Sequence, residues 1–121
     1  MRWPLHPDTG TIDVTTTGRR SGRQIRIEIW YVVVGGEVYL TGSPGPRNWL
    51  ANLRQTPEAT LHVGVGKAYP IGVSAEEVTD ADERRALVPG IWAVQPWYEE
   101  NYPDLEDWVR RSPMVRLTRL E

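Results

Sequence analysis

Cysteine is absent from the sequence, and its absence excludes disulfide bonds, thiolate catalysis and metal sites built on Cys ligands. Histidine is scarce: His6 and His62 are the only two, and their separation does not match the spacing of a metal-ligand pair. No Ser-His pair for nucleophilic catalysis is evident either. The sequence therefore predicts no metal site. If the protein is an enzyme, its chemistry is of a kind that needs none of these groups.

Long apolar runs are also missing. The first seven residues, Met1 to Pro7, lack the apolar core of a signal peptide, and no later run approaches the length of a membrane span. We therefore expect a cytoplasmic protein with no stable membrane insertion.

An excess of positive charge is the third missing feature. The formal net charge is −2, which argues against a general nucleic-acid binder. A nucleic-acid-binding barrel would interleave basic and aromatic residues on one sheet face, but Glu28 separates Arg26 from Trp30. Positive charge is nevertheless concentrated within eight residues, at Arg19, Arg20, Arg23 and Arg26. This local cluster favours a small anionic ligand and no nucleic-acid partner.

The length of 121 residues fits a single domain, which we place at 1–121 with an irregular lead-in over 1–10. Apolar residues make up 40% of the chain and charged residues 25%, the range of an ordinary globular protein. No internal repeat is visible. The chain is long enough for one hydrophobic core but too short for two domains.

Six segments have the alternating apolar pattern of strands. They span residues 11–17, 23–34, 37–41, 59–65, 68–78 and 114–120. Gly35-Gly36 is a strong hairpin signal between the second and third. Short helices are predicted over 47–55 and from Thr79 to about Leu87, where Pro89-Gly90 should end the second one, with one or two more helical turns within 91–111. The predicted fold is mainly β (α+β): a six-stranded antiparallel barrel with short decorating helices.

Two loops have the composition of anion-binding loops. In the first, Gly18 and Gly22 bracket Arg19-Arg20-Ser21, so that a tight turn presents two guanidinium groups beside a hydroxyl. In the second, the glycine- and proline-rich run 42–46 leads into a helix, which directs free backbone N–H groups at whatever the loop encloses. The Gly35-Gly36 hairpin places the strand before the second loop, 37–41, beside the strand that follows the arginine loop, 23–34. A bare charged hairpin tip is the alternative explanation of the first loop, and a connection that merely turns the chain is the alternative for the second.

One face of the second strand is apolar throughout, whereas the other begins polar and ends apolar, so the strand is expected to become covered on both faces. Trp30 lies at the point of this change. A large aromatic side chain at such a point either packs under a neighbouring element or forms the wall of a ligand site. The residue pattern by itself somewhat favours packing.

Several of these segments together resemble the deazaflavin (F420)-dependent nitroreductase family. They are Thr15-Thr16-Thr17-Gly18-Arg19-Arg20-Ser21-Gly22-Arg23, Ile29-Trp30-Tyr31, Gly42-Ser43-Pro44-Gly45 and Trp49-Leu50-Ala51-Asn52-Leu53, with Pro57 shortly after. The resemblance covers residues 11–65 well and the rest loosely. It implies a split β-barrel of the flavin-reductase type. Members bind reduced F420 and pass a hydride to nitro compounds, quinones or enones, while some relatives of the barrel use FMN or haem-derived ligands.

The resemblance also implies a role for particular residues. The phosphate or acidic tail of the cofactor would contact the first loop, at Gly18, Arg19, Arg20, Ser21 and Gly22. The deazaflavin would lie beside Trp30, and the ring or phosphate would run along Gly42, Ser43 and Gly45. The helix that closes the site would contribute Trp49 and Asn52. The family's substrate-side tyrosines are matched loosely by Trp97, Tyr98 and Tyr102, and Tyr98 is the candidate catalytic hydroxyl. The chain lacks the Pro-x-Trp-Tyr motif before Trp49, and Gln95 stands where a tyrosine is common.

The leading hypothesis is an F420H2-dependent oxidoreductase that reduces a small electrophilic acceptor. The alternative is a non-catalytic split barrel, or one that binds FMN, a tetrapyrrole or an acyl ligand. In its non-catalytic form this alternative predicts no room for a cofactor ring near Trp30. Relatives of this barrel pair as dimers, and six tryptophans suit an interface, so a homodimer is a further expectation.

Overall fold

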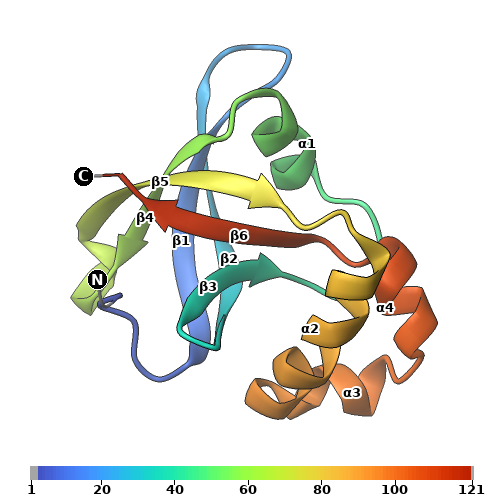
Figure 1. Ribbon diagram of the computed structural model, residues 1–121. Coiled ribbons are helices and arrows are strands. Elements are labelled where there is room, and N and C mark those ends of the chain that lie inside the picture. The colour runs from blue at the N-terminus through green and yellow to red at the C-terminus, as the bar shows by residue number, and fades with distance from the viewer. Residues whose placement is uncertain (1–2, 121) are drawn as a thin grey trace.

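A computed structural model describes residues 3–120 and shows six strands closed into a barrel, in the order β1-β2-β3-β6-β5-β4 (Figure 1). Every neighbouring pair is antiparallel. The barrel closes between β1 and β4 through only three residue pairs, which involve Asp13 to Thr15 of β1. The strands are β1 Thr9–Thr17, β2 Gln24–Val34, β3 Glu37–Thr41, β4 Glu58–Val63, β5 Tyr69–Glu77 and β6 Met114–Arg119. The predicted fold class is confirmed.

In the described part of the chain, four helices decorate the barrel at two places. They are α1 Asn48–Gln55, α2 Ala81–Val94, α3 Pro96–Asn101 and α4 Leu105–Arg111, with a short 3-10 turn, η1, at Val65–Lys67. In Figure 1, α1 lies near the β1–β2 hairpin at the top, whereas α2, α3 and α4 gather at the lower right. No helix within residues 3–120 combines the length and the apolar character that crossing a membrane requires.

The core has two parts, and β2 takes part in both. Val14, Leu40 and Leu61 fill the barrel interior. Val32 lies on the outer side of β2 and packs with Trp108 and other buried residues of the helical cluster. The sequence predicted that β2 becomes covered on both faces along its length, and the structure confirms this change.

Strand ends differ from the prediction by about two residues. β1 begins at Thr9 instead of residue 11, so the irregular lead-in is shorter than expected; residues 1 and 2 lie outside the described part. β4 ends at Val63 instead of residue 65, because Gly64 has a φ of 78° and turns the chain into η1. The Gly35-Gly36 hairpin is confirmed, with φ values of 60° and 78°.

The prediction that Pro89-Gly90 ends the second helix is wrong. α2 continues through both residues to Val94. Proline has no N–H to donate to the carbonyl one turn earlier, which normally weakens a helix. Here Val88 and Ile91 are fully buried against the barrel, and this tertiary packing outweighs the missing hydrogen bond.

Gly90 is the point of closest approach between α2 and β2. A Cβ atom at this position would lie 2.8 Å from Val34 Cγ1. Gly90→Ala should therefore lower the free energy of unfolding by about 1–2 kcal/mol, although alanine normally stabilises a helix interior by about 1 kcal/mol. Urea denaturation measures the change, and Val34→Ala in the same chain should recover part of it. A gain in stability from Gly90→Ala alone would contradict this packing.

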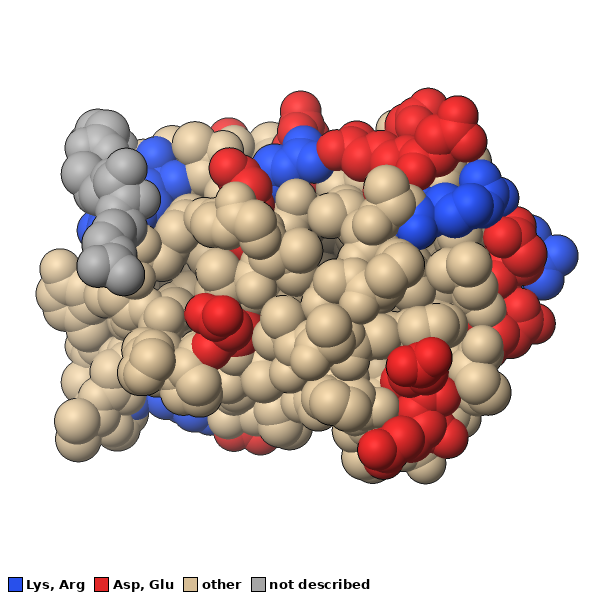
Figure 2. All heavy atoms as spheres, turned by 60° about the horizontal axis from the view of Figure 1, so that its bottom comes forward, with Lys and Arg blue, Asp and Glu red and all other residues tan. Residues whose placement is uncertain are grey.

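The face at the bottom of Figure 1 is brought forward in Figure 2 and is largely uncharged at its centre. Acidic side chains gather toward one end, and Lys and Arg appear only in small groups near the rim (Figure 2). The described part of this face therefore carries no concentration of positive charge.

Candidate active site

The β1–β2 hairpin holds its arginine loop by its own hydrogen bonds. Gly18 N donates to Arg23 O at 2.8 Å, Gly22 N donates to Gly18 O at 2.9 Å, and Arg23 N donates to Ser21 Oγ at 3.1 Å. Gly22 has a φ of 72°, a conformation that glycine adopts without strain. The loop thus has a defined shape with Arg19 and Arg20 at its tip.

Arg19 is oriented by α1. Its backbone N and its Nη1 both donate to Asn52 Oδ1, at 3.1 and 3.0 Å, and Asn52 Nδ2 donates to Thr16 Oγ1 at 3.3 Å. Asn52 is 4% exposed and accepts both hydrogen bonds from Arg19, so it positions the arginine loop from the buried side. Within residues 3–120, neither Arg19 nor Arg20 pairs with a carboxylate. Both positive charges remain uncompensated.

A cavity of 550 Å³, the hairpin pocket, lies between this loop and α1. It is lined by Thr16, Gly18, Arg19, Arg20, Ser21, Ile25, Ile27, Asn48, Trp49 and Asn52. One side is apolar and the other carries the two arginines, so the pocket is suited to a ligand with an apolar body and an anionic group.

A second cavity of 630 Å³, the aromatic pocket, adjoins the first at Trp49. β3 pairs with β2 only over Tyr31 to Val34, which leaves an open edge of β2 beside this space. The lining residues are Glu28, Ile29, Trp30, Thr41, Gly42, Ser43, Arg47, Trp49, Gln95, Trp97 and Tyr98. Trp30 is 45% exposed, which favours the ligand-wall interpretation of this residue over packing.

The loop between β3 and α1 wraps around Arg47. Arg47 Nη2 donates to Ser43 O at 2.9 Å and Nη1 donates to Gly45 O at 3.0 Å. A Cβ atom at Gly42 would lie 2.8 Å from Arg47 Nη2, so glycine makes room for the guanidinium group. Gly45 has a φ of 137°. Both glycines therefore have a structural reason for being there, apart from any contact with a ligand.

Tyr98 is 5% exposed, and its pKa is raised above the usual value of a phenol, mainly by burial. The nearby Thr41 hydroxyl and the Arg47 charge act in the opposite direction. Although Thr41 is near enough to influence Tyr98, its buried Oγ1 makes no hydrogen bond of normal geometry with any described residue. Buried hydroxyls are normally hydrogen bonded, so the Thr41 side chain marks a wall suited to a polar group.

Most predicted site residues come together in these two cavities. The hairpin pocket collects Gly18, Arg19, Arg20, Ser21, Trp49 and Asn52, and the aromatic pocket collects Trp30, Gly42, Ser43, Trp49 and Tyr98. Gly22 and Gly45 line neither. Tyr102 also stays outside and packs on Trp97 with ring centroids 6.0 Å apart. Thr41 and Arg47 were not predicted; their only sequence signal is their place on either side of the glycine-rich loop.

Residues 4–116 match the model of the F420H(2)-dependent quinone reductase family. The chain belongs to this family. It is therefore an oxidoreductase with coenzyme F420 as its cofactor, and the resemblance to F420-dependent reductases noted in the sequence is confirmed.

Solved structures share the fold at low sequence identity. The conserved hypothetical protein Rv2991 from Mycobacterium tuberculosis is 23% identical, with a TM-score of 0.66, 92% of this chain and 73% of that chain covered. An F420-H2 dependent reductase (FDR-A) is 21% identical, with a TM-score of 0.61 and coverage of 88% and 91%. A structure described as a domain-swapped dimer is 20% identical, with a TM-score of 0.65 and coverage of 89% and 79%.

The two cavities fit the chemistry of F420. The cofactor carries a flat deazaflavin ring and a phosphate with an acidic tail. The hairpin pocket offers cations that no carboxylate neutralises, and the aromatic pocket offers a wall with Trp30 and Trp49. The 630 Å³ aromatic pocket beside Trp30 also disagrees with the alternative of a non-catalytic barrel, which predicted no room for a cofactor ring there. Within residues 3–120, no cluster of His, Asp and Glu is able to hold a metal ion.

Proposed function

We propose that this F420H2-dependent reductase transfers a hydride to a quinone, with F420 bound across the hairpin and aromatic pockets. The observation that carries the proposal is that a cationic pocket and an aromatic pocket adjoin at Trp49. When bound, the reduced deazaflavin supplies the hydride. The protein binds and orients both reactants and provides polar groups for the acceptor.

The proposed roles follow the placement of the side chains. Arg19 and Arg20 hold the phosphate or the acidic tail through charge-assisted hydrogen bonds. Ile25 and Ile27 form the apolar wall of the hairpin pocket, and their sequence alternation points both toward this side of β2. Trp49 separates the two pockets and contributes to the wall of each.

The acceptor side is the part of the aromatic pocket formed by Gln95, Trp97 and Tyr98. Because burial raises the pKa of Tyr98 above the usual value of a phenol, the side chain stays protonated at neutral pH and can donate a hydrogen bond or a proton to an acceptor oxygen. Arg47 lines the same pocket and favours negative charge that develops on that oxygen. A flat, uncharged quinone fits this wall, and the family name supports it over nitro compounds and enones.

A binding and turnover experiment tests the proposal. Tryptophan fluorescence quenching should show micromolar affinity for F420 and weaker affinity for FMN. Oxidation of F420H2, followed by absorbance, should then be faster with a naphthoquinone than with a nitroarene or an enone at equal concentration. Failure to bind F420 would refute the cofactor assignment. Preference for a nitro or enone acceptor would refute the quinone assignment alone.

Removal of the two buried hydroxyls in the aromatic pocket should reduce turnover with little loss of stability. For Tyr98→Phe we expect kcat/KM to fall about 10- to 100-fold, and for Thr41→Val about tenfold. Thr41 makes no hydrogen bond of normal geometry, so Thr41→Val should leave the melting temperature nearly unchanged. Thr41→Ser is the matched control and should keep the activity.

The combination of both substitutions shows whether the two hydroxyls act together. If they serve one polar group, the loss in the double variant should be smaller than the product of the single losses. Between pH 6 and pH 9, the wild-type rate should show no titration from Tyr98, because its raised pKa keeps the phenol neutral throughout this range. Full activity of Tyr98→Phe would exclude a role for its hydroxyl.

We also propose that the protein forms a homodimer. Trp30, Trp97 and Tyr102 are each more than 40% exposed and belong to the aromatic pocket or to its neighbourhood. Aromatic residues are enriched at interfaces, and a solved structure with the same fold is described as a domain-swapped dimer. Light scattering coupled to gel filtration distinguishes the dimer from a monomer.

A further inference from the structure

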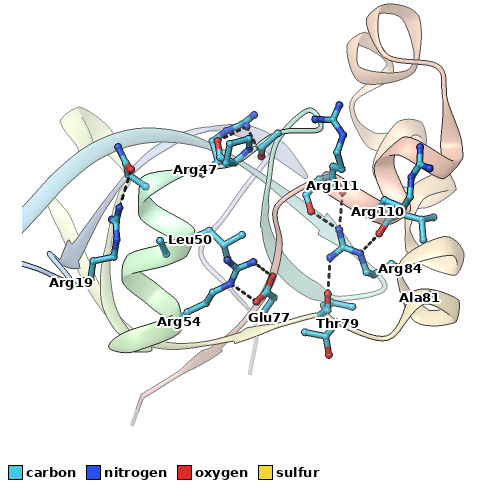
Figure 3. A pocket seen from close by; sticks show the side chains of 17 residues that line it. Arg19, Arg47, Leu50, Arg54, Glu77, Thr79, Ala81, Arg84, Arg110 and Arg111 are labelled. Carbon is cyan, nitrogen blue, oxygen red and sulfur yellow. Dashed lines mark hydrogen bonds and ion pairs between the residues drawn. The ribbon is translucent and has the colours of Figure 1, made fainter.

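A third cavity, of 680 Å³, lies between α1, the end of β5 and α4, and it shares Arg47 with the aromatic pocket. We call it the arginine pocket (Figure 3). Six arginines line it, namely Arg19, Arg47, Arg54, Arg84, Arg110 and Arg111. Among the residues that the structure describes, Glu77 is the one acidic residue in its lining. This is a high density of positive charge for a protein whose formal net charge is −2.

Only part of this charge is neutralised by carboxylates. Arg54 forms two hydrogen bonds with Glu77, at 2.8 and 2.7 Å, and these two side chains cancel each other (Figure 3). Arg110 and Arg111 share Asp107, which does not line the cavity. That pairing leaves a net positive charge at the α4 side.

Within residues 3–120, none of the other three arginines forms an ion pair with a carboxylate, although Glu77 attracts Arg84 over a longer distance. Arg19 donates to the amide oxygens of Asn48 and Asn52, and Arg47 and Arg84 donate mainly to backbone carbonyls. These neutral acceptors fix the guanidinium groups in place without removing their charge. Because the guanidinium groups are already held in fixed positions, they need little rearrangement when an anion binds in their positive potential.

The beginning of α1 adds to this potential. Asn48, Leu50 and Ala51 line the cavity, and the N-cap residue, Arg47, makes no side-chain hydrogen bond to the helix. The first N–H groups of a helix have no partner inside it, and together with the helix dipole they favour an anion. An uncapped helix start and the unpaired arginines therefore converge on one cavity.

We propose that the arginine pocket is an anion-binding site for a ligand that carries two or more carboxylate or phosphate groups. A single small anion would leave most of the arginines that line the cavity without contact to the ligand. Arg19 lines both this cavity and the hairpin pocket, so the ligand comes either from the acidic tail of the neighbouring cofactor or from a separate polyanion in solution. Anion binding itself does not depend on the proposed reaction.

Substitution of the Arg54–Glu77 pair tests the site in both directions. The probes are pyrophosphate and a γ-linked triglutamate peptide, each titrated alone by calorimetry at low ionic strength. Arg54→Gln should weaken probe binding about 3- to 10-fold, and Glu77→Gln should strengthen it by a similar factor, because each changes the charge of the wall by one unit in opposite directions. Arg85→Gln is the matched control: it also removes an arginine paired with a glutamate, but outside the cavity.

A comparison of cofactor forms identifies the source of the anion. If the cofactor tail occupies the site, Arg54→Gln should weaken intact F420 but leave the affinity for the deazaflavin chromophore without phosphate and tail unchanged. If a separate polyanion occupies it, both forms should bind the variant as they bind the wild type, while the two probes still lose affinity. Binding of the bare chromophore also tests the cofactor pocket itself, so that failure of the two proposals can be distinguished.

The proposal is overturned if neither probe binds the wild-type protein at low ionic strength. It is also overturned if Arg54→Gln and Glu77→Gln change probe binding in the same direction, or if Arg85→Gln weakens it as much as Arg54→Gln.

Discussion

Replacement of Arg84 by methionine should lower the free energy of unfolding by about 3–5 kcal/mol, a large part of the total stability that is usual for a folded protein. Arg84 is 6% exposed. Its Nε donates to Val109 O at 2.7 Å, its Nη1 donates to Val78 O at 2.7 Å, and its Nη2 donates to the carbonyls of Trp108 and Ser112. One side chain therefore serves four buried carbonyl groups.

The position of these carbonyls explains the size of the effect. They belong to the end of α4, to the residue after α4 and to the residue after β5, so Arg84 of α2 ties three segments together. Methionine fills much of the same volume but donates no hydrogen bond. Trp108 O would still accept from Ser112, but the carbonyls of Val78, Val109 and Ser112 would lose the bond from Arg84, and unpartnered buried carbonyls are expensive. Burial lowers the pKa of Arg84, but an arginine remains charged at all ordinary pH values.

Urea denaturation measures this loss, with two variants for comparison. Arg84→Lys should recover only a small part of the stability, because one ammonium group cannot reproduce the planar fork of donors. Arg85→Met on the same helix should change the free energy of unfolding by less than about 0.5 kcal/mol, since its ion pairs are exposed. A loss of 1 kcal/mol or less in Arg84→Met would show that the hydrogen bonds of Arg84 are not important for folding.

Removal of both charges from the hairpin loop should have the largest effect on cofactor binding. For Arg19→Gln combined with Arg20→Gln, we expect the Kd for F420 to rise about 100-fold, roughly tenfold for each charge-assisted contact. The fold should survive the change. The backbone N of Arg19 keeps its hydrogen bond to Asn52 Oδ1, and Arg20 is exposed.

Arg23→Gln is the matched control for this experiment. Arg23 lies in the same hairpin but lines neither the hairpin pocket nor the arginine pocket. We expect its Kd for F420 to stay within about twofold of the wild-type value. Fluorescence titrations at two salt concentrations provide a second readout, because wild-type affinity should fall with salt more steeply than that of the double variant. Equal losses in Arg23→Gln and in the double variant would refute specific contacts at Arg19 and Arg20.

Local sequence signals determined most of the barrel. A strand alternates side chains between two faces, so the apolar pattern of β2 and its neighbours could be read residue by residue. Glycine permits positive φ, so Gly22 and the Gly35-Gly36 pair marked real turns. The motif from Thr15 to Arg23, together with the other segments of the family resemblance, also pointed to the correct cofactor, because these motifs lie in contiguous residues.

Only the tertiary structure decided which distant residues share a cavity. α2 runs through Pro89 because packing against β2, which no local pattern contains, outweighs a lost hydrogen bond. Asn52 was predicted as a cofactor contact, but its place beneath Arg19 depends on how α1 docks against the hairpin. The arginine pocket is the clearest case: its six arginines come from five separate stretches between residues 19 and 111, and their charges add only because the fold brings them together. Electrostatic potential depends on distance in space, and separation along the chain does not reveal that distance.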